Sequence, residues 1–348
     1  RKMVMVTQKM ETYKTKLAIV LLNWNGKKWL EKFLPTLIAY SDKAEIYVID
    51  NQSSDDSISY IKNNYKKVNL IINQLNGGYA KGYNDGLKKI DAEYFILINS
   101  DIEVTKNWTK PIIDLMESSK QIAACQPKIL DYNNKHMFEY AGASGGFIDY
   151  LGYPYCRGRI FNNIESDHGQ YNDSIEIFWA TGACICVRSK YFEEINGFDE
   201  DFFAHQEEID LCWRFKNKKY KIMCQPKSTV FHVGGGTLDP KSSFKTYLNF
   251  RNNLYMLFKN LHIIDLLFII PIRLILDGIA ALTFIFNKNG FSHFYSIIKA
   301  HFSFYCNIFK LISKRKKINQ KREHTGKTKI SIVFASKIKN NSIYSKLK

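Results

Sequence analysis

Asp101 is the first residue whose type and position suggest chemistry. It follows Asn99 and Ser100 in a short turn at the end of an apolar, strand-like run. Mg²⁺ and Mn²⁺ prefer carboxylate oxygens and commonly share them with the phosphate oxygens of a nucleotide. Asp101 is therefore a candidate metal ligand. The alternative is a turn aspartate that caps a helix expected to begin near Lys106, and the spacing favours neither interpretation.

A second group of carboxylates lies much later in the chain. Glu207, Glu208 and Asp210 crowd the start of a predicted helix whose following positions are apolar. Like charges this close raise the pKa of one member, which suits a general base. The alternative is the ordinary acidity of a helix N-terminus, with Arg214 at the right spacing to pair with Asp210.

His232 ends a strand-like run and is followed closely by three glycines at 234–236. A neutral imidazole at this position could bind a metal ion, and the glycines would let the next loop close over phosphates. A histidine in an apolar strand is more often a core residue. The adjacent glycines weaken that plainer interpretation.

The elements that must position these residues alternate between strand-like and helix-like through the first half of the chain. Buried strands are predicted at 17–23, 45–50, 69–73 and 94–99, and helices at 27–40, 55–65 and 79–90. Strands separated by helices in this way predict an α/β, doubly wound sheet.

Polar residues fall where these predicted strands end, which is where such sheets bind ligands. They are Asn23, Asn25 and Gly26, followed by the segments at 50–56, 75–86 and 99–104. Each has a plainer interpretation as a helix cap or a turn. Their common placement at one edge of the sheet favours a binding site.

The charge of the chain is concentrated at its end. The formal net charge is +17, and residues 310–348 hold thirteen Lys or Arg against Glu323 alone. This distribution argues against a nucleic-acid-binding surface and for a basic tail beside an anionic membrane surface. Seven cysteines without paired spacing, and no recognisable signal peptide, indicate a reducing compartment, with Cys125, Cys184, Cys186, Cys212 and Cys224 as core residues.

The segment 261–286 is apolar and long enough for the ~20 residues of a membrane span. Asp265, Pro271, Arg273 and Asp277 interrupt it, and charges at bilayer depth are costly. Two short interfacial helices, or a re-entrant pair broken near Pro271, are expected instead. The aromatic stretch at 291–317 ends in four consecutive cations, as in a peripheral anchor. The alternative is a small helical domain packed in water.

These patterns divide the chain into four parts. Residues 1–15 form an N-terminal tail, residues 16–260 a catalytic domain, residues 261–312 a helical membrane-association region, and residues 313–348 a basic tail. The expected location is the cytoplasmic face of the cell membrane, where the protein would be held peripherally.

An ordered set of segments carries a resemblance to a known family. They are NWNG, DNQSSDDS, NGGYAKGYNDG, NSDIEV, TGACICVRSKYFEEINGFDEDFF, EEIDLCWR, FHVGGGT and the Arg251-Asn252 pair. From about 16 to 255 the chain resembles the family 2 glycosyltransferases, especially their rhamnosyltransferase-like branch. The resemblance implies the GT-A fold, a nucleotide-diphospho-sugar transferase fold with a mixed sheet flanked by helices.

The resemblance also implies roles for individual residues. Asp50 would hold the nucleobase, Asp101 the metal on the donor diphosphate, and His232 would complete the metal or diphosphate site. The donor pocket would include Asn23, Asn25, Asn76, Gly78, Asn84 and Asn99. Glu208 would be the catalytic base, with Glu207 beside it. Two departures stand out: NSD replaces a two-carboxylate DXD motif, and EE replaces Glu-Asp, so that Glu207 is an alternative base.

The function implied is a metal-assisted, inverting sugar transfer. The donor would be a UDP- or dTDP-sugar, the ion Mg²⁺ or Mn²⁺, and the acceptor a hydroxyl of a glycan, in particular a lipid-linked or surface-polysaccharide precursor. Because the NSD and EE motifs are altered, a catalytically inactive nucleotide-sugar-binding or assembly protein is the alternative. The sequence does not indicate the sugar, the linkage or the oligomeric state.

Overall fold

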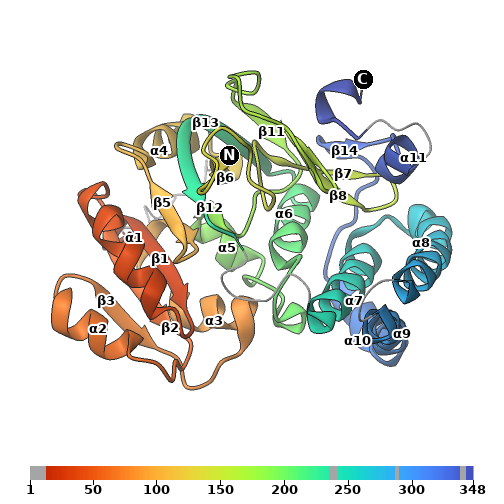
Figure 1. The fold of residues 1–348 in the computed structure, drawn as a ribbon, viewed down its shortest axis with the longest axis horizontal. Coiled ribbons are helices and arrows are strands. Elements are labelled where there is room, and N and C mark those ends of the chain that lie inside the picture. The colour runs from red at the N-terminus through yellow and green to blue at the C-terminus, as the bar shows by residue number, and fades with distance from the viewer. Residues whose placement is uncertain (1–12, 235–241, 287–289, 338–341, 348) are drawn as a thin grey trace, which may run out of the picture.

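The computed structural model describes residues 13–234, 242–286, 290–337 and 342–347. The predicted apolar runs form the parallel half of a nine-stranded sheet (Figure 1). Its strands are β1 (Thr15–Asn23), β2 (Glu45–Asp50), β3 (Asn69–Ile72) and β4 (Ala92–Ile98). β1 lies between β2 and β4, and β3 pairs with the outer edge of β2.

Side chains of β1 alternate between two hydrophobic cores, one on each face of the sheet. Ala18 and Val20 belong to one core, and Leu17, Ile19 and Leu21 belong to the other. The first core includes residues of α3 (Gly78–Leu87) and α6 (Glu207–Asn217). The second includes residues of α1 (Lys27–Ala39), α2 (Ser57–Asn64) and α4 (Thr109–Ser118).

Later strands make the sheet mixed. β12 (Cys184–Arg188) is antiparallel to β4 and to β6 (Ile122–Asp131), and β6 is parallel to β13 (Lys221–His232). β11 (Ile175–Ile177) and β5 (Ile102–Val104) both pair with β13. The predicted α/β sheet with flanking helices is confirmed. The helix expected near Lys106 is present as α4 and begins at Thr109, but β5 lies between it and Asp101, so Asp101 does not cap it.

A second, smaller sheet involves the basic C-terminal segment. Its strands are β7 (Gly146–Asp149), β8 (Pro154–Cys156), β9 (Arg159–Ile160), β10 (Asn163–Ile164) and β14 (Lys327–Thr328). β14 pairs in parallel with β7, beyond which lie α11 (Ile332–Lys337) and a short 3₁₀ turn at Tyr344–Lys346. The Tyr344 ring contacts the rings of Phe147, Tyr155 and Tyr171. This part of the basic segment therefore packs on the body of the protein.

Between the two sheets and the C-terminal helices lie the elements that carry the second carboxylate group. α5 (Ser189–Glu194) and a 3₁₀ turn at Glu200–Phe202 precede α6, and α7 (Ser243–Asn260) packs against α6. The five cysteines predicted as core residues are buried and free, as expected.

The C-terminal helices lie at the side of the molecule away from β1–β3 (Figure 1). They are α8 (Ile263–Ile285), α9 (Gly290–Cys306) and α10 (Ile308–Arg315). The expected break near Pro271 is wrong, because α8 runs through it as one helix. Leu266 and Ile269 before the proline and Ala281 after it are all buried, so packing holds both halves in line. Within the described residues, no helix is both long and apolar enough to cross a bilayer.

α8 has its charged side chains on the inside. Arg273 and Asp277 are 3% and 1% exposed and form an ion pair at 3.3 Å. The guanidinium also stacks on Tyr153 and donates to the carbonyl oxygen of Leu151. The opposite side of the helices is apolar and exposed. We call it the outer apolar face; its residues are Ile263, Ile264, Leu267, Phe268, Ile272, Ile275, Ile279, Leu282 and Phe286 on α8 and its C-terminal end, and Phe291, Tyr295, Ile298, Phe302, Tyr305 and Phe309 on α9 and α10.

We expect Arg273→Ala to lower the free energy of unfolding by about 3–5 kcal/mol, because it removes the arginine partner of the buried Asp277 carboxylate and leaves it beside His301, whose Nε2 lies 3.5 Å from Asp277 Oδ2. Equilibrium urea unfolding measures the change. The pair of substitutions Arg273→Met with Asp277→Leu should recover much of the loss, since no buried charge remains unpaired. Lys110→Ala, which removes an exposed ion pair to Asp114, is the control and should cost under ~1 kcal/mol. A double variant as unstable as Arg273→Ala would contradict this explanation.

Candidate active site

The end of β1 and the end of β2 share a buried polar cluster around Asp50. Asn23 Nδ2 donates to Asp50 Oδ2 at 2.9 Å, and Ser53 donates to the same carboxylate from its hydroxyl at 2.7 Å and from its backbone N–H at 2.8 Å. Asn25, with φ of 50°, accepts from the backbone N–H groups of Ser54 and Asp55. The predicted residues Asn23, Asn25 and Asp50 therefore meet, and they order the loop at 51–56.

Asn76 and Gly78 form a second cluster with residues that the sequence analysis did not single out. Asn51 donates to Asn76 Oδ1 at 2.9 Å, and Asn73 donates to Asn51 Oδ1 at 3.1 Å. Gly78 has φ of +79°, and a Cβ there would lie 2.4 Å from the carbonyl oxygen of Phe203. Only glycine fits this position, because both the backbone conformation and the space exclude a side chain.

Asn84 links α3 to the segment before the second carboxylate group. Its Nδ2 donates to the carbonyl oxygen of Phe198 at 2.9 Å and to Glu200 at 3.2 Å, and its Oδ1 accepts from the backbone N–H of Phe198 at 3.0 Å. Both ends of the amide are thus occupied by protein groups. In this structure Asn84 ties α3 to residues 198–200.

Asp101 and His232 meet although they are far apart in the sequence. β5 pairs with the end of β13, and this register brings His232 Nε2 to 3.2 Å from Asp101 Oδ1 and to 3.4 Å from Asn99 Nδ2. Glu139 lies 3.2 Å from the other ring nitrogen. Burial lowers the pKa of His232, but the Glu139 and Asp101 carboxylates on its two sides outweigh burial and raise the pKa to about 10.

The donor set at this point fits a divalent ion in part. Asp101 supplies one carboxylate, and among the residues that the structure describes no group of three or more His, Cys, Asp or Glu could hold a metal by itself. Further ligands would have to come from a bound phosphate. The protonated His232 is a hydrogen-bond donor and can bind a metal only after losing its proton. Gly234 has φ of +75°, whereas residues 235 and 236 of the glycine run lie outside the described residues.

Glu207 and Glu208 stand at the first turn of α6. The Oε2 atoms of both side chains are buried and have no hydrogen-bond partner in the described structure. Burial, together with the Glu208 carboxylate, raises the pKa of Glu207 well above its ordinary value. Burial raises the pKa of Glu208 to about 7. A carboxylate oxygen that lacks a hydrogen-bond partner and has a pKa near neutrality is suited to act as a general base.

The residues just before Glu207 have strained backbone conformations. Phe203, His205 and Gln206 have φ of 63°, 70° and 68°, in the left-handed region that non-glycine residues avoid. α7 holds this segment in place: Asn252 Nδ2 lies within 3.0 Å of the carbonyl oxygens of Phe202, Ala204 and His205. In addition, Asn253 donates to the side chain of Gln206 at 2.9 Å.

A buried ion network also holds the segment that leads into the Glu207–Glu208 pair. Lys259 of α7 contacts Asp199 and Asp210, and Lys314 of α10 contacts Asp199 and Asp201. Burial raises the pKa of Asp210, but Lys259 and Arg214 outweigh burial and lower the pKa overall. Asp210 therefore stays ionised. Unlike Glu207 and Glu208, it is held by protein partners on both oxygens, Arg214 and Asn260.

The segment at 181–183 joins the parts of the site. The backbone N–H of Asn99 donates to the carbonyl oxygen of Ala183 at 2.9 Å, and the Tyr79 hydroxyl donates to that of Gly182 at 2.7 Å. A Cβ on Gly182 would lie 3.7 Å from Glu208 Cβ, so the Asn99–Asp101 turn and the start of α6 flank one short stretch of chain. Gly26 lies between Asn23 and Ser100 in a similar way, because a Cβ on Gly26 would lie 2.4 Å from Asn23 Oδ1 and 3.6 Å from Ser100 Oγ.

Several residues of the site were missed by the sequence analysis. Asn51 and Ser53 lie inside the segment 50–56, which the sequence placed at the sheet edge. Asn252 belongs to the Arg251-Asn252 pair that contributed to the family resemblance. The sequence therefore contained a signal for all three residues. Glu139 had none, because nothing near it in sequence marks it as a partner of His232.

Comparisons with known proteins identify the family. The family model described as glycosyl transferase family 2 matches residues 18–195, just over half of the chain. The chain therefore belongs to glycosyl transferase family 2, and the predicted family is confirmed. Residues 196–232, which carry the Glu207–Glu208 pair and His232, lie beyond the matched segment.

Similar proteins include several sugar transferases. A low-salt glycan biosynthesis hexosyltransferase of Haloferax volcanii is 24% identical over 68% of this chain and 73% of its own length. An N-acetylglucosaminyl-diphospho-decaprenol L-rhamnosyltransferase of Mycobacterium tuberculosis is 23% identical over 62% and 75%, and a rhamnosyltransferase of Escherichia coli is 23% identical over 62% and 82%. The predicted likeness to the rhamnosyltransferase-like branch is confirmed.

A solved structure shows the same fold. GalNAc-T7, determined with UDP, GalNAc and Mn²⁺, superposes with a TM-score of 0.56 at 16% identity. The match covers 71% of this chain and 48% of that protein, so the chain spans about half of its length. At this identity the likeness concerns the fold, which is the GT-A arrangement expected from the sequence.

The raised pKa of Glu208 predicts a pH-dependent stability. The native state keeps this proton up to about pH 7, whereas an unfolded glutamate loses it near pH 4.3. Stability should therefore fall as the pH rises from about 4 to above 7. In Glu208→Gln this part of the fall should disappear, as measured by urea unfolding across that range. Glu193→Gln, at an exposed position on α5, is the matched control. An unchanged pH slope in Glu208→Gln would contradict the assignment.

Proposed function

We propose that this family 2 glycosyltransferase moves a sugar from a UDP- or dTDP-linked donor to a hydroxyl group of a lipid-linked or surface-polysaccharide precursor, with inversion at the anomeric carbon. The observation that carries the proposal is the unpaired Oε2 atom of Glu208, whose side chain lies beside Gly182, next to Ala183, which accepts a hydrogen bond from the Asn99–Asp101 turn. A base and a diphosphate-binding group on one sheet edge are what such a displacement needs.

The donor nucleotide is assigned to the loops that follow β1, β2 and β3. Asp50 is fully buried and accepts three hydrogen bonds, so it acts by ordering the loop at 51–56, whose backbone would meet the nucleobase. Asn76 and Gly78 shape the next loop, and Asn84 fixes the helix behind it. Asn25 closes the first loop over the second.

The diphosphate is assigned to Asn99, Asp101 and His232. A divalent cation, Mg²⁺ or Mn²⁺, held by Asp101 would offset the negative charge of the departing diphosphate. His232, held between Asp101 and Glu139, would supply a hydrogen-bond donor to the diphosphate or, after losing its proton, a further ligand to the metal. The NSD motif thus keeps one carboxylate and gains an imidazole from the end of β13.

Glu208 is the better candidate for the base. Its pKa of about 7 leaves a large ionised fraction at neutral pH, whereas the pKa of Glu207 is raised well above its ordinary value. Glu208 would accept the proton of the acceptor hydroxyl as that oxygen bonds to the anomeric carbon and the bond to the diphosphate oxygen breaks. Glu207, still protonated, would hold the pair in place without adding a second negative charge.

The acceptor and the location rest on the relatives and on the C-terminal helices. The mycobacterial relative is named for a lipid-linked diphosphate acceptor. The outer apolar face lies on the helices that the sequence analysis assigned to a membrane. Together these support a peripheral position on the inner face of the cell membrane, next to a lipid-linked substrate.

Donor binding provides the first test of the proposal. Calorimetry with UDP, dTDP and GDP, each with and without Mn²⁺, should show metal-dependent binding of UDP or dTDP. Asp101→Asn should weaken the Mn²⁺-dependent binding at least about tenfold, since it removes the one firm carboxylate. Asp114→Asn, at an exposed position on α4, should leave binding unchanged. Equal Mn²⁺-dependent binding by Asp101→Asn and the unmodified protein would contradict the metal assignment.

Turnover separates an enzyme from an inactive relative. With lipid-linked acceptors, Glu208→Gln should lower kcat about 10²–10⁴-fold while donor affinity is kept, because it removes a general base. In the unmodified enzyme kcat/KM should rise with pH and level off above about pH 7, since the base must be ionised. NMR of the product should show the inverted anomer. Donor binding without turnover of any acceptor would instead support a nucleotide-sugar-binding protein.

A further inference from the structure

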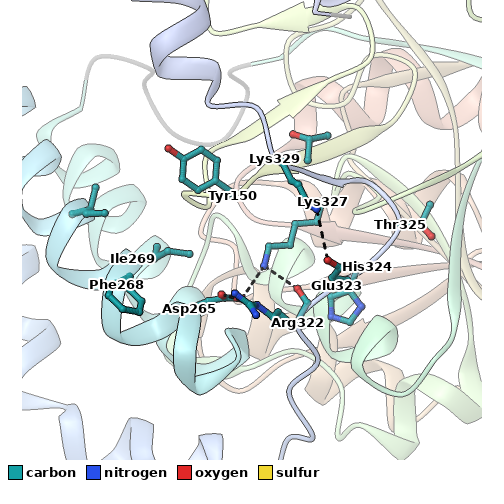
Figure 2. Close-up of a pocket in the computed structure, with 12 residues that line it drawn as sticks. Tyr150, Asp265, Phe268, Ile269, Arg322, Glu323, His324, Thr325, Lys327 and Lys329 are labelled. Carbon is teal, nitrogen blue, oxygen red and sulfur yellow. Dashed lines mark hydrogen bonds and ion pairs between the residues drawn. The ribbon is translucent and has the colours of Figure 1, made fainter.

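A charged cleft opens beside the first half of α8. The cavity has a volume of about 860 Å³. It lies between this helix and the segment at 322–329, which includes β14. Figure 2 shows side chains from both walls reaching into it. They include Asp265, Phe268 and Ile269 from α8, and Arg322, Lys327 and Lys329 from the C-terminal segment.

Cations outnumber carboxylates in the cleft. Asp265 is shared between Arg322, whose Nε lies 3.1 Å from its Oδ1, and Lys327, whose Nζ lies 3.7 Å from its Oδ2 (Figure 2). Lys329 is 94% exposed and has Glu323 at 4.0 Å, a distance at which an exposed pair contributes little. The partly buried Asp265 carboxylate is therefore shared by two cations, Glu323 pairs only weakly with Lys329, and a phosphate group would complete the charge balance.

The apolar side of the cleft continues into the outer apolar face. Phe268 lines the cleft and is 68% exposed, and Ile272, one turn further, lines it and is 43% exposed. From there the exposed residues of α8 recur every three or four positions to Phe286. A cationic pocket at the end of a long apolar stripe is complementary to a molecule with an anionic head and hydrocarbon chains.

The orientation of α8 favours lipid as the occupant of this face. Its buried ion pair, Arg273 with Asp277, points into the protein, and Asp265 points into the cleft. The outer apolar face consequently carries no charged residue of α8. Charge appears at its margins instead, in Arg322, Lys327 and Lys329, where the headgroups of an anionic leaflet would lie.

We propose that the outer apolar face and the cleft beside α8 form one docking site for an anionic lipid leaflet. Arg322 and Lys329, which are 61% and 94% exposed, contact the phosphate headgroups, with Lys327 behind them in the cleft. Phe268 and Ile272 enter the acyl region. The proposal rests on the peripheral membrane location proposed above and specifies the surface, the orientation of α8 and the preference for anionic lipid.

The test uses the full chain and sedimentation with two kinds of vesicle, phosphatidylcholine alone and phosphatidylcholine with phosphatidylglycerol. The protein should partition onto the anionic vesicles more strongly. Arg322→Gln with Lys329→Gln should weaken that partitioning about fivefold for each cation removed. Ile272→Asp should weaken partitioning onto both kinds of vesicle, because it places a charge in the apolar face.

Matched controls are available elsewhere in the chain. Ile72 on β3 has the same 43% exposure as Ile272, and Ile72→Asp should have no effect. Lys62→Gln with Lys110→Gln removes two cations from α2 and α4 and should leave the preference for anionic vesicles unchanged. Donor binding by the same variants is also measured by calorimetry. Intact donor binding together with lost vesicle binding, or the reverse, separates a failure of this proposal from a failure of the proposed function.

Three outcomes would overturn the proposal. One is equal partitioning onto neutral and anionic vesicles. Another is anionic binding that Ile272→Asp leaves intact, since binding would then be electrostatic alone. The third is a protein that binds neither kind of vesicle and forms a dimer in light scattering that Ile272→Asp dissociates, because a second copy would then cover the face.

Discussion

The ammonium group of Lys259, buried between the carboxylates of Asp199 and Asp210, is the interaction on which the rest of the site depends. Asp210 belongs to α6, the helix that begins with Glu207 and Glu208. Asp199 belongs to the loop that leads into that helix, and Lys259 to α7. A charge buried in this way must be fully paired, since removal of one partner costs about 3–5 kcal/mol. The loop, α6 and α7 are therefore fixed relative to one another.

That constraint lets the protein keep two unfavourable features at the same place. Phe203, His205 and Gln206 have left-handed backbone conformations, and the two glutamates that follow hold unpaired oxygens in a buried site. Each feature costs free energy, and neither would persist in a loop free to relax. Asn252 and the Lys259 network offset the cost with hydrogen bonds and ion pairs from α7. Strain and raised pKa thus coincide where the proposed base stands.

The same network connects the proposed active site to the C-terminal helices. Lys314 of α10 reaches Asp199 and Asp201, so a helix bearing part of the outer apolar face directly contacts the loop before Glu207. α8 is held by its own buried pair, Arg273 with Asp277, which turns its charged side inward. The surface proposed to meet lipid and the residues proposed to act on a lipid-linked substrate are therefore parts of one packed unit.

Sequence patterns determined the strand runs and the loops that gather at the sheet edge, because apolar periodicity and short polar motifs are local properties. Asn23, Asp101 and the Glu207–Glu208 pair were named from such patterns, whereas the family and the roles of Asp50 and Asn76 came from the resemblance that the ordered motifs carry. Only the tertiary structure decided that β5 pairs with β13, which brings Glu139 and Asp101 to the two sides of His232. It also decided that α8 is continuous and turns its charges inward. These outcomes depend on packing between segments that are distant in the sequence, and local periodicity does not specify which distant segments will meet.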